Sequence, residues 1–241
     1  MADVLTPRLL GSLARAALDN SSNLLADAKI LLNEGRHPRA LALTVLAAEE
    51  FGKHMICMSA AVFDLDDPTE VKKFWKRFRN HEAKYQNWHG QLIDYIAIDP
   101  RTPFEPSKVE PDLWDEMWEE MPRVVKEAMT LKLRALYVDE QDGQPTRPDD
   151  LVDPELATTA WKDVSMIVED AQTRWAGADL SEFLERSAPR INKLRLAMLK
   201  AKETGDPNPA LSVFGDVLGL SEDEMARLGD AWAAPRSPEE E

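Results

Sequence analysis

One short segment of this chain carries the residue types that phosphodiester chemistry uses. Between Val71 and Gln86, six basic residues stand against a single acid, Glu82, although the chain as a whole has a net charge of −15. The six are Lys72, Lys73, Lys76, Arg77, Arg79 and Lys84. His81 lies among them, and an imidazole can give or take a proton near neutral pH. Cations one helical turn away would hold a phosphate group and stabilise its developing charge.

Helical spacing would place these groups together. At 3.6 residues per turn, a single helix face from Lys73 to Trp88 would carry Arg77, His81 and Lys84. We therefore predict that His81 is the acid or base and that Arg77 and Lys84 hold phosphate. Further binding residues are expected beside them: Lys73, Lys76 and Arg79. The alternative is a solvated basic face that docks on an acidic one, such as residues 112–120.

A second segment has charges inside an apolar helix, where an unpaired charge is costly. Local pairs at i,i+4 would satisfy them, Glu49 with Lys53 and Glu50 with His54. The other interpretation is that Glu50 and Lys53 point into a polar pocket shared with other helices. Gly52 favours this pocket, because glycine costs ~1 kcal/mol inside a helix and is best explained by the close approach of another backbone.

A third segment, residues 131–139, is predicted to be the carboxyl end of a helix, with two cations, a phenol and a carboxylate close together there. Cations suit the carboxyl end of a helix dipole, which would explain Lys132 and Arg134 without any site. That explanation does not cover Tyr137 and Asp139. We predict a supporting polar pocket of five residues: Glu50, Lys53, Arg134, Tyr137 and Asp139.

Several other chemistries lack their residues here. The four histidines include no HExxH pair and no two at a metal-binding spacing, and no GxSxG or phosphate-binding glycine loop is present. Cys57 is the one cysteine, so the chain forms no internal disulfide, and its apolar neighbours place it in a core. We expect no metal and no cofactor.

Composition predicts a folded, cytoplasmic protein. Hydrophobic residues make up 44% of the 241 residues and charged residues 30%. Uncharged apolar runs such as residues 40–48 are too short to span a membrane, and we expect no export signal at the start. A net charge of −15 excludes a protein that coats nucleic acid generally through phosphates.

Apolar periodicity and capping signals predict an all-α protein in which the helix over 37–62, apolar on most sides, is central. We expect helices over 7–34, 37–62, 69–96 (with a break near Asn80), 111–138, 154–175, 180–202 (bent at Pro189), 209–218 and 221–233. Residues 20–23 would either kink the first helix or lie on its solvent-exposed face. Loops are expected over 99–106 and 139–153, and a disordered tail over 235–241.

These segments, in this order, resemble the AbiV family of bacterial abortive-infection proteins, which belongs to the HEPN superfamily. The matching pieces lie within residues 7–150 and are Ala26–Leu43, Ala47–Lys53, His81–Lys84 and Leu136–Asp139. The resemblance implies a HEPN-like helical bundle and a role in defence against phage. Many HEPN proteins are metal-independent RNases that act as dimers, marked by Arg and His with four to six residues between them. Here Arg77 and His81 have three between them, and Lys76 and His81 have four.

The resemblance therefore implies a bundle over residues 1–153, and we predict a helical extension over 154–234, without a counterpart in the family, packed on it. We predict an abortive-infection effector, acting as a homodimer, that cleaves RNA without a metal and binds it through Lys73, Lys76 and Arg79. The rival is a non-catalytic module that blocks phage or host translation through a protein partner. The enzyme predicts an open groove with His81 exposed and with Lys53, Arg134 and Asp139 nearby. The rival predicts a basic segment covered by the acidic start of the helix over 111–138.

Overall fold

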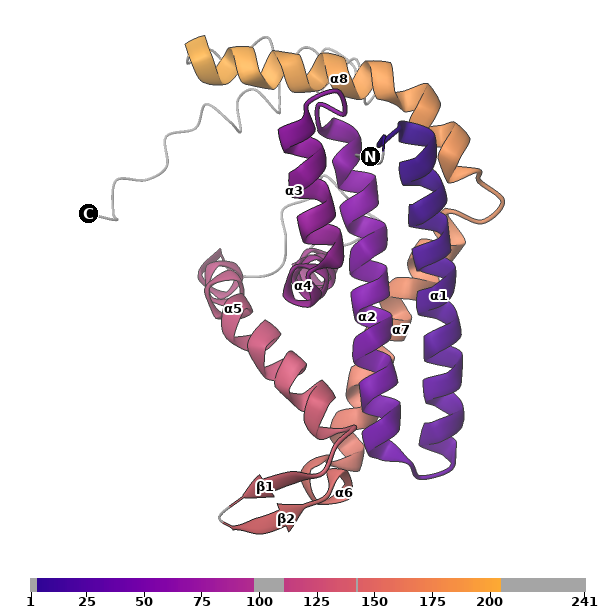
Figure 1. Cartoon of the computed structure of the whole chain (residues 1–241), viewed down its shortest axis with the longest axis vertical. Helices are drawn as coiled ribbons and strands as arrows, with labels where there is room; N and C mark the ends of the chain where they lie inside the picture. The colour runs from indigo at the N-terminus through magenta and orange to yellow at the C-terminus, as the bar shows by residue number, and fades with distance from the viewer. Residues whose placement is uncertain (1–3, 98–110, 142, 205–241) are drawn as a thin grey trace, which may run out of the picture.

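The structure is a computed structural model that describes residues 4–97, 111–141 and 143–204. It is a helical bundle with one small hairpin (Figure 1). Its elements in chain order are α1 (Pro7–Asn33), α2 (His37–Ser59), a 3-10 turn (Ala60–Val62), α3 (Pro68–Arg79), α4 (His81–Ala97), α5 (Pro111–Arg134), β1 (Asp139–Gln141), β2 (Gln144–Thr146), α6 (Pro148–Leu151), α7 (Pro154–Arg174) and α8 (Leu180–Thr204). The all-α prediction is confirmed.

The first helical pair follows the capping signals in the sequence. Thr6 accepts a hydrogen bond from the Leu9 amide at 3.1 Å and so caps α1, which begins at Pro7. Gly35 has a φ of +70° and turns the chain from α1 into α2. The interpretation of residues 20–23 as a kink or a wet face is wrong for Ser21. It is fully buried and donates to the Ala47 carbonyl of α2 at 2.8 Å.

α2 is the central helix, as predicted. It packs against α1, α4, α5 and α7, and Figure 1 shows it between α1 and α3. A larger core lies around its first two thirds, where Leu41, Val45 and Phe51 meet side chains of α4, α5 and α7. A smaller core at its other end joins α1, α3 and α8. Burial on nearly all sides explains why α2 reads as apolar in every direction.

The chain breaks between α3 and α4, as the sequence suggested at Asn80. Asn80 is extended, with φ −84° and ψ 123°, and its side chain caps α4 by accepting from the Ala83 amide at 2.7 Å. Figure 1 shows α4 end-on, whereas α3 runs lengthwise in the plane of the view. The prediction of one continuous basic face is wrong because the two helices point in different directions. Lys84 and Trp88 are buried in α4, whereas Lys73 on α3 is exposed.

Residues 134–147 differ from the sequence prediction. α5 ends at Arg134 rather than near 138, and β1 and β2 form an antiparallel hairpin in which Asp139 pairs with Thr146. Gly143, at φ +76°, supplies the left-handed residue that the turn needs. Strands of three mostly polar residues carry no alternating pattern, which is why this hairpin reads as a loop in the sequence.

The carboxyl-terminal helices match their predicted ranges. α7 contributes Val164, Ile167 and Val168 to the larger core, and α8, which contains Pro189, crosses the upper ends of the bundle in Figure 1. The helices predicted over 209–218 and 221–233, the loop over 99–106 and the tail over 235–241 lie outside the described residues. The division into 1–153 and 154–234 stays a prediction. Within the described residues, no helix is both long and apolar enough to cross a membrane.

Candidate active site

The site forms around Glu49, a carboxylate in the middle of α2 that is only 1% exposed. Close packing of α4 on α2 brings other polar groups to it. A Cβ atom at Gly52 would lie 1.8 Å from the carbonyl oxygen of Lys84, so only glycine permits this approach. The sequence interpretation of Gly52 as a point of close backbone approach is confirmed, and the contact places the first turn of α4 beside Glu49.

Three cationic or titratable groups converge on the Glu49 carboxylate. The Lys132 ammonium of α5 donates to Oε1, the His81 Nδ1 lies 2.5 Å from Oε2, and the Lys84 Nζ lies 3.3 Å from Oε2. Lys84 and Lys132 are both buried, and an isolated buried ammonium is costly. We call these four residues the carboxylate cluster. Its one negative and two positive charges leave a net charge of +1 when His81 is neutral.

The hydrogen bond to Glu49 determines which ring nitrogen of His81 carries a proton. Burial acts to raise the pKa of Glu49, but hydrogen bonds from Lys132 and His81 and the charge of the two lysines outweigh it, so the pKa is lowered. An ionised carboxylate only accepts hydrogen bonds, so the His81 Nδ1 must carry the proton that points at Oε2. The Nε2 of a neutral His81 is then an unprotonated acceptor. Because the side chain is 61% exposed, this nitrogen is accessible from solvent.

The structure places the predicted catalytic residues in two groups. His81 and Lys84 belong to the carboxylate cluster, where the Lys84 Nζ lies 3.4 Å from the His81 Nδ1. Arg77 instead donates to the Asn87 Oδ1 at 3.4 Å and lines a groove of about 320 Å³ that Asn87 and Trp118 also line. Arg77 therefore lies close to the site in sequence, but its hydrogen bond is to Asn87 and not to His81.

The basic residues of α3, which precede His81 in the chain, form an exposed face. We call Lys72, Lys73, Lys76, Arg77 and Arg79 the α3 basic face, and all five are exposed. Lys73 pairs with Glu70 at 2.7 Å, and the Arg79 guanidinium lies 5.2 Å from the Trp75 ring centre. In the part of the chain that the structure describes, none of the five forms an ion pair with α5. The described part of α5 therefore does not cover this face, and the side chains of residues 111–115, at the acidic start of α5, lie outside the described ones.

The five residues of the predicted supporting pocket are not brought together. Glu50 and Lys53 pair with each other at 2.5 Å on α2. Arg134 and Asp139 lie 3.8 Å apart at the far end of α5, and Tyr137 is 63% exposed there. The Glu50–Lys53 pair is half-buried on α2 and the Arg134–Asp139 pair is exposed, and within the described residues neither pair forms a hydrogen bond or ion pair with the side chains of the carboxylate cluster.

The alternative prediction of local pairs in α2 is also wrong. Lys53 pairs with Glu50 rather than Glu49. His54 is buried, and its Nδ1 lies 3.0 Å from the Ala14 carbonyl, to which it donates. Burial lowers the pKa of His54, so the ring is neutral and holds α1 against α2.

Glu49 and Lys132, the two residues that define the site, were both named from the sequence, but neither was assigned to the site. Both occupy apolar stripes that could have identified them. On α2, Glu49 follows Leu41 and Val45 at intervals of four residues, and all three are buried on the same side of the helix. Lys132 stands in the buried stripe of α5, which runs Met121, Val125, Ala128, Lys132 and Ala135. A single charge at a core position of each helix is the signal that the two meet.

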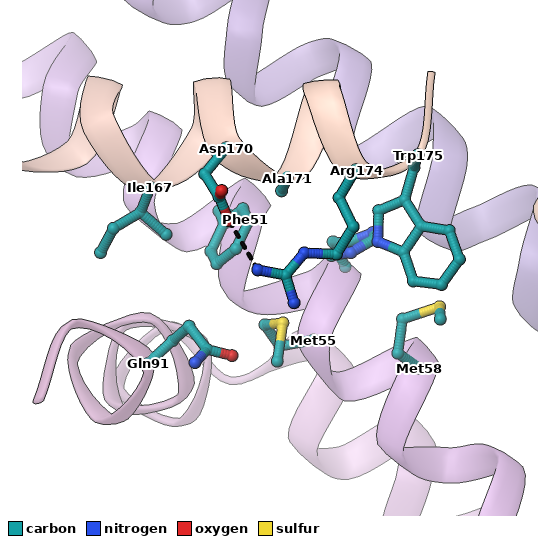
Figure 2. A pocket seen from close by; sticks show the side chains of 10 residues that line it. Phe51, Met55, Met58, Gln91, Ile167, Asp170, Ala171, Arg174 and Trp175 are labelled. Carbon is teal, nitrogen blue, oxygen red and sulfur yellow. Dashed lines mark hydrogen bonds and ion pairs between the residues drawn. The ribbon is translucent and has the colours of Figure 1, made fainter. Parts of the chain in front are cut away.

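A second hollow lies between α2, α4 and α7 (Figure 2). It has a volume of about 160 Å³, with walls of Phe51, Met55 and Trp175. Figure 2 shows the Arg174 guanidinium at this hollow, paired with Asp170 at 2.8 Å. Arg174 and Asp170 form an ion pair with each other, and His54 donates to the Ala14 carbonyl of α1. The described residues of this hollow therefore offer no free group for proton transfer.

Cysteine and metal chemistry find no support among the described residues. Burial raises the pKa of the Cys57 thiol to about 12, so it is not a nucleophile at neutral pH. Within the same residues, no group of three or more His, Cys, Asp and Glu side chains could hold a metal ion.

The family comparison assigns this helical bundle to the HEPN-type proteins. A HEPN family model, described as AbiV, matches residues 10–169, which include all four members of the carboxylate cluster. The chain belongs to the AbiV family, which assigns it to the abortive-infection proteins. No curated protein and no solved structure matches it.

Proposed function

We propose that this protein is an anti-phage abortive-infection effector that cleaves RNA without a metal ion, with His81 as the acid and base. The observation that carries the proposal is the contact between the buried Glu49 carboxylate and the Nδ1 of an exposed histidine, at 2.5 Å. A carboxylate in this position fixes the ring orientation and tautomer and stabilises the imidazolium that forms during proton transfer. An ordinary surface histidine has no such partner.

The chemistry follows from the free Nε2 of His81. This nitrogen takes the proton of a ribose 2′-hydroxyl, whose oxygen then attacks the adjacent phosphorus. The bond from phosphorus to the 5′ oxygen breaks, and the proton is returned to that oxygen. Lys84 and Lys132 keep Glu49 ionised throughout, and their charge leaves the carboxylate cluster positive towards a phosphate.

The α3 basic face supplies the binding surface in this proposal. Lys72 and Lys76 are exposed and make no side-chain hydrogen bond or ion pair within the described residues. Phosphate contacts by such groups position a nucleic acid without reading its sequence. On a chain of net charge −15 the general affinity for nucleic acid is weak, so we assign the RNA contacts next to His81 to the α3 basic face.

Cells offer the first test of the proposal. Expression of the wild type should produce cleaved RNA and protection from phage, and His81→Ala should abolish both. Glu82→Gln is the matched control, because Glu82 is the exposed neighbour of His81 in the same turn of α4. Purified His81→Ala must retain the melting temperature of the wild type. Protection without RNA cleavage in the wild type would reject the nuclease.

A second candidate function, the non-catalytic module that binds a protein partner, is favoured by one observation. Four apolar residues at the end of α5 are exposed: Leu133 at 55%, Leu136 at 44%, Tyr137 at 63% and Val138 at 66%. Contiguous apolar surface often marks a protein interaction site. If this function is correct, Tyr137→Ser with Val138→Ser abolishes protection while His81→Ala leaves it intact.

A further inference from the structure

A third hollow lies at the end of the bundle where α1 turns into α2, beside the β1–β2 hairpin (Figure 1). Its volume is about 520 Å³, within the range of small-molecule sites. The hollow is separate from the carboxylate cluster. Arg39, which lines it, precedes Glu49 by ten residues on α2, or ~15 Å at 1.5 Å per residue.

Three arginines from different segments line this hollow. Arg36 ends the α1–α2 turn, Arg39 is in the first turn of α2, and Arg147 precedes α6. All three are exposed, and within the described part of the chain none of their side chains makes a hydrogen bond or an ion pair. Asp149 is the acid among the described lining residues, which leaves a net charge of +2. Like charges gathered without partners repel one another, and a bound anion would relieve that repulsion.

The remaining walls are apolar. Pro38 and Ala135 are buried, and Leu136 and Val138 project beside them with exposures of 44% and 66%. An inorganic ion needs no such surface, whereas a phosphate attached to a base and sugar would cover it. The amino end of α2 has no side-chain cap, so its positive dipole end is open towards the same region.

We propose that this hollow, the arginine pocket, binds the phosphate of a nucleotide unit. Guanidinium groups match phosphate oxygens in pairs, and the apolar walls take the sugar or base. The source of the unit is a free nucleotide or one residue of an RNA strand, and both present the same chemistry. The arginine pocket does not depend on cleavage at His81, so it stands even if the proposed nuclease function fails.

Binding of two probes to the purified full chain tests the arginine pocket. The probes are ATP without added metal and a short 2′-O-methyl oligonucleotide, which lacks the hydroxyl needed for cleavage. Titration calorimetry and fluorescence anisotropy compare the wild type with Arg36→Gln/Arg39→Gln. The matched control is Arg186→Gln/Arg190→Gln, which removes the same charge from exposed positions on α8.

We expect the wild type to bind at least one probe and the pocket variant to bind it at least ~10-fold more weakly. The α8 control should stay within about two-fold of the wild type, and inorganic phosphate should compete. ATP binding identifies a free nucleotide as the ligand, and binding of the oligonucleotide alone identifies a strand. Equal losses in the two double variants, or no binding of either probe to the wild type, would overturn the proposal.

Discussion

Replacing Glu49 with Gln tests the physical basis of the site, because the side chain keeps its shape and loses its charge. Lys84 and Lys132 would then be buried without a carboxylate. Removing one partner of a buried ion pair costs about 3–5 kcal/mol. For a domain of this size, 1 kcal/mol shifts the melting temperature by about 2–4 °C, so we expect a loss of roughly 6–20 °C.

Glu50→Gln is the matched control, one residue along the same helix. Glu50 has a single, partly exposed partner in Lys53, so its loss should cost about 1 kcal/mol or less. Urea unfolding of both variants measures the difference. Adding Lys132→Met to Glu49→Gln should recover part of the loss, because one unpaired ammonium is removed. Equal and small losses for Glu49→Gln and Glu50→Gln would refute the buried cluster.

Three further predictions follow from the same contacts. Because the pKa of Glu49 is lowered in the folded protein, its ion pairs stabilise the fold fully above the pKa of an unfolded carboxyl, about 4.3. This stabilisation is lost as the pH falls through the lower pKa of the folded state. The free energy of unfolding of Glu49→Gln should therefore depend less on acid pH than that of the wild type. Gly52→Ala should lower the free energy of unfolding by about 3 kcal/mol, because the added Cβ would meet the Lys84 backbone. In Gly90→Ala the added Cβ would meet the Trp118 side chain, which can move, rather than backbone, so the loss should be smaller. Thermal melting compares the two variants, and equal losses would contradict the packing. Cys57 should stay unlabelled by a thiol reagent at neutral pH until the protein unfolds, and rapid native labelling would disprove its burial.

The fold was largely predictable from local signals. Proline preceded by a capping residue begins α1, α3 and α7, with Thr6, Asp67 and Asp153 accepting from the first-turn amides. Each of these caps acts over a few residues, so the sequence contains the whole of it. Gly52 was also readable, because a glycine in an apolar helix needs a nearby backbone.

The partners within the site could not be read in the same way. Local spacing offers Glu49 the neighbour Lys53, but packing buries Glu49 and brings Lys132 from 83 residues away. The turn at Asn80 redirects α4, so residues four apart across it do not share a face. Both outcomes depend on how helices cross, which the pattern of a single helix does not encode.

The most direct test of the account is cleavage of defined RNA by purified protein with a chelator present. Wild type, Glu82→Gln and His81→Gln are compared at equal concentration, after their melting temperatures are shown to agree. The account predicts that wild type and Glu82→Gln cleave equally, and that His81→Gln is at least ~100-fold slower because the proton-transfer group is lost. Equal cleavage by His81→Gln, or none by the wild type, would contradict the assignment of His81 as the acid and base.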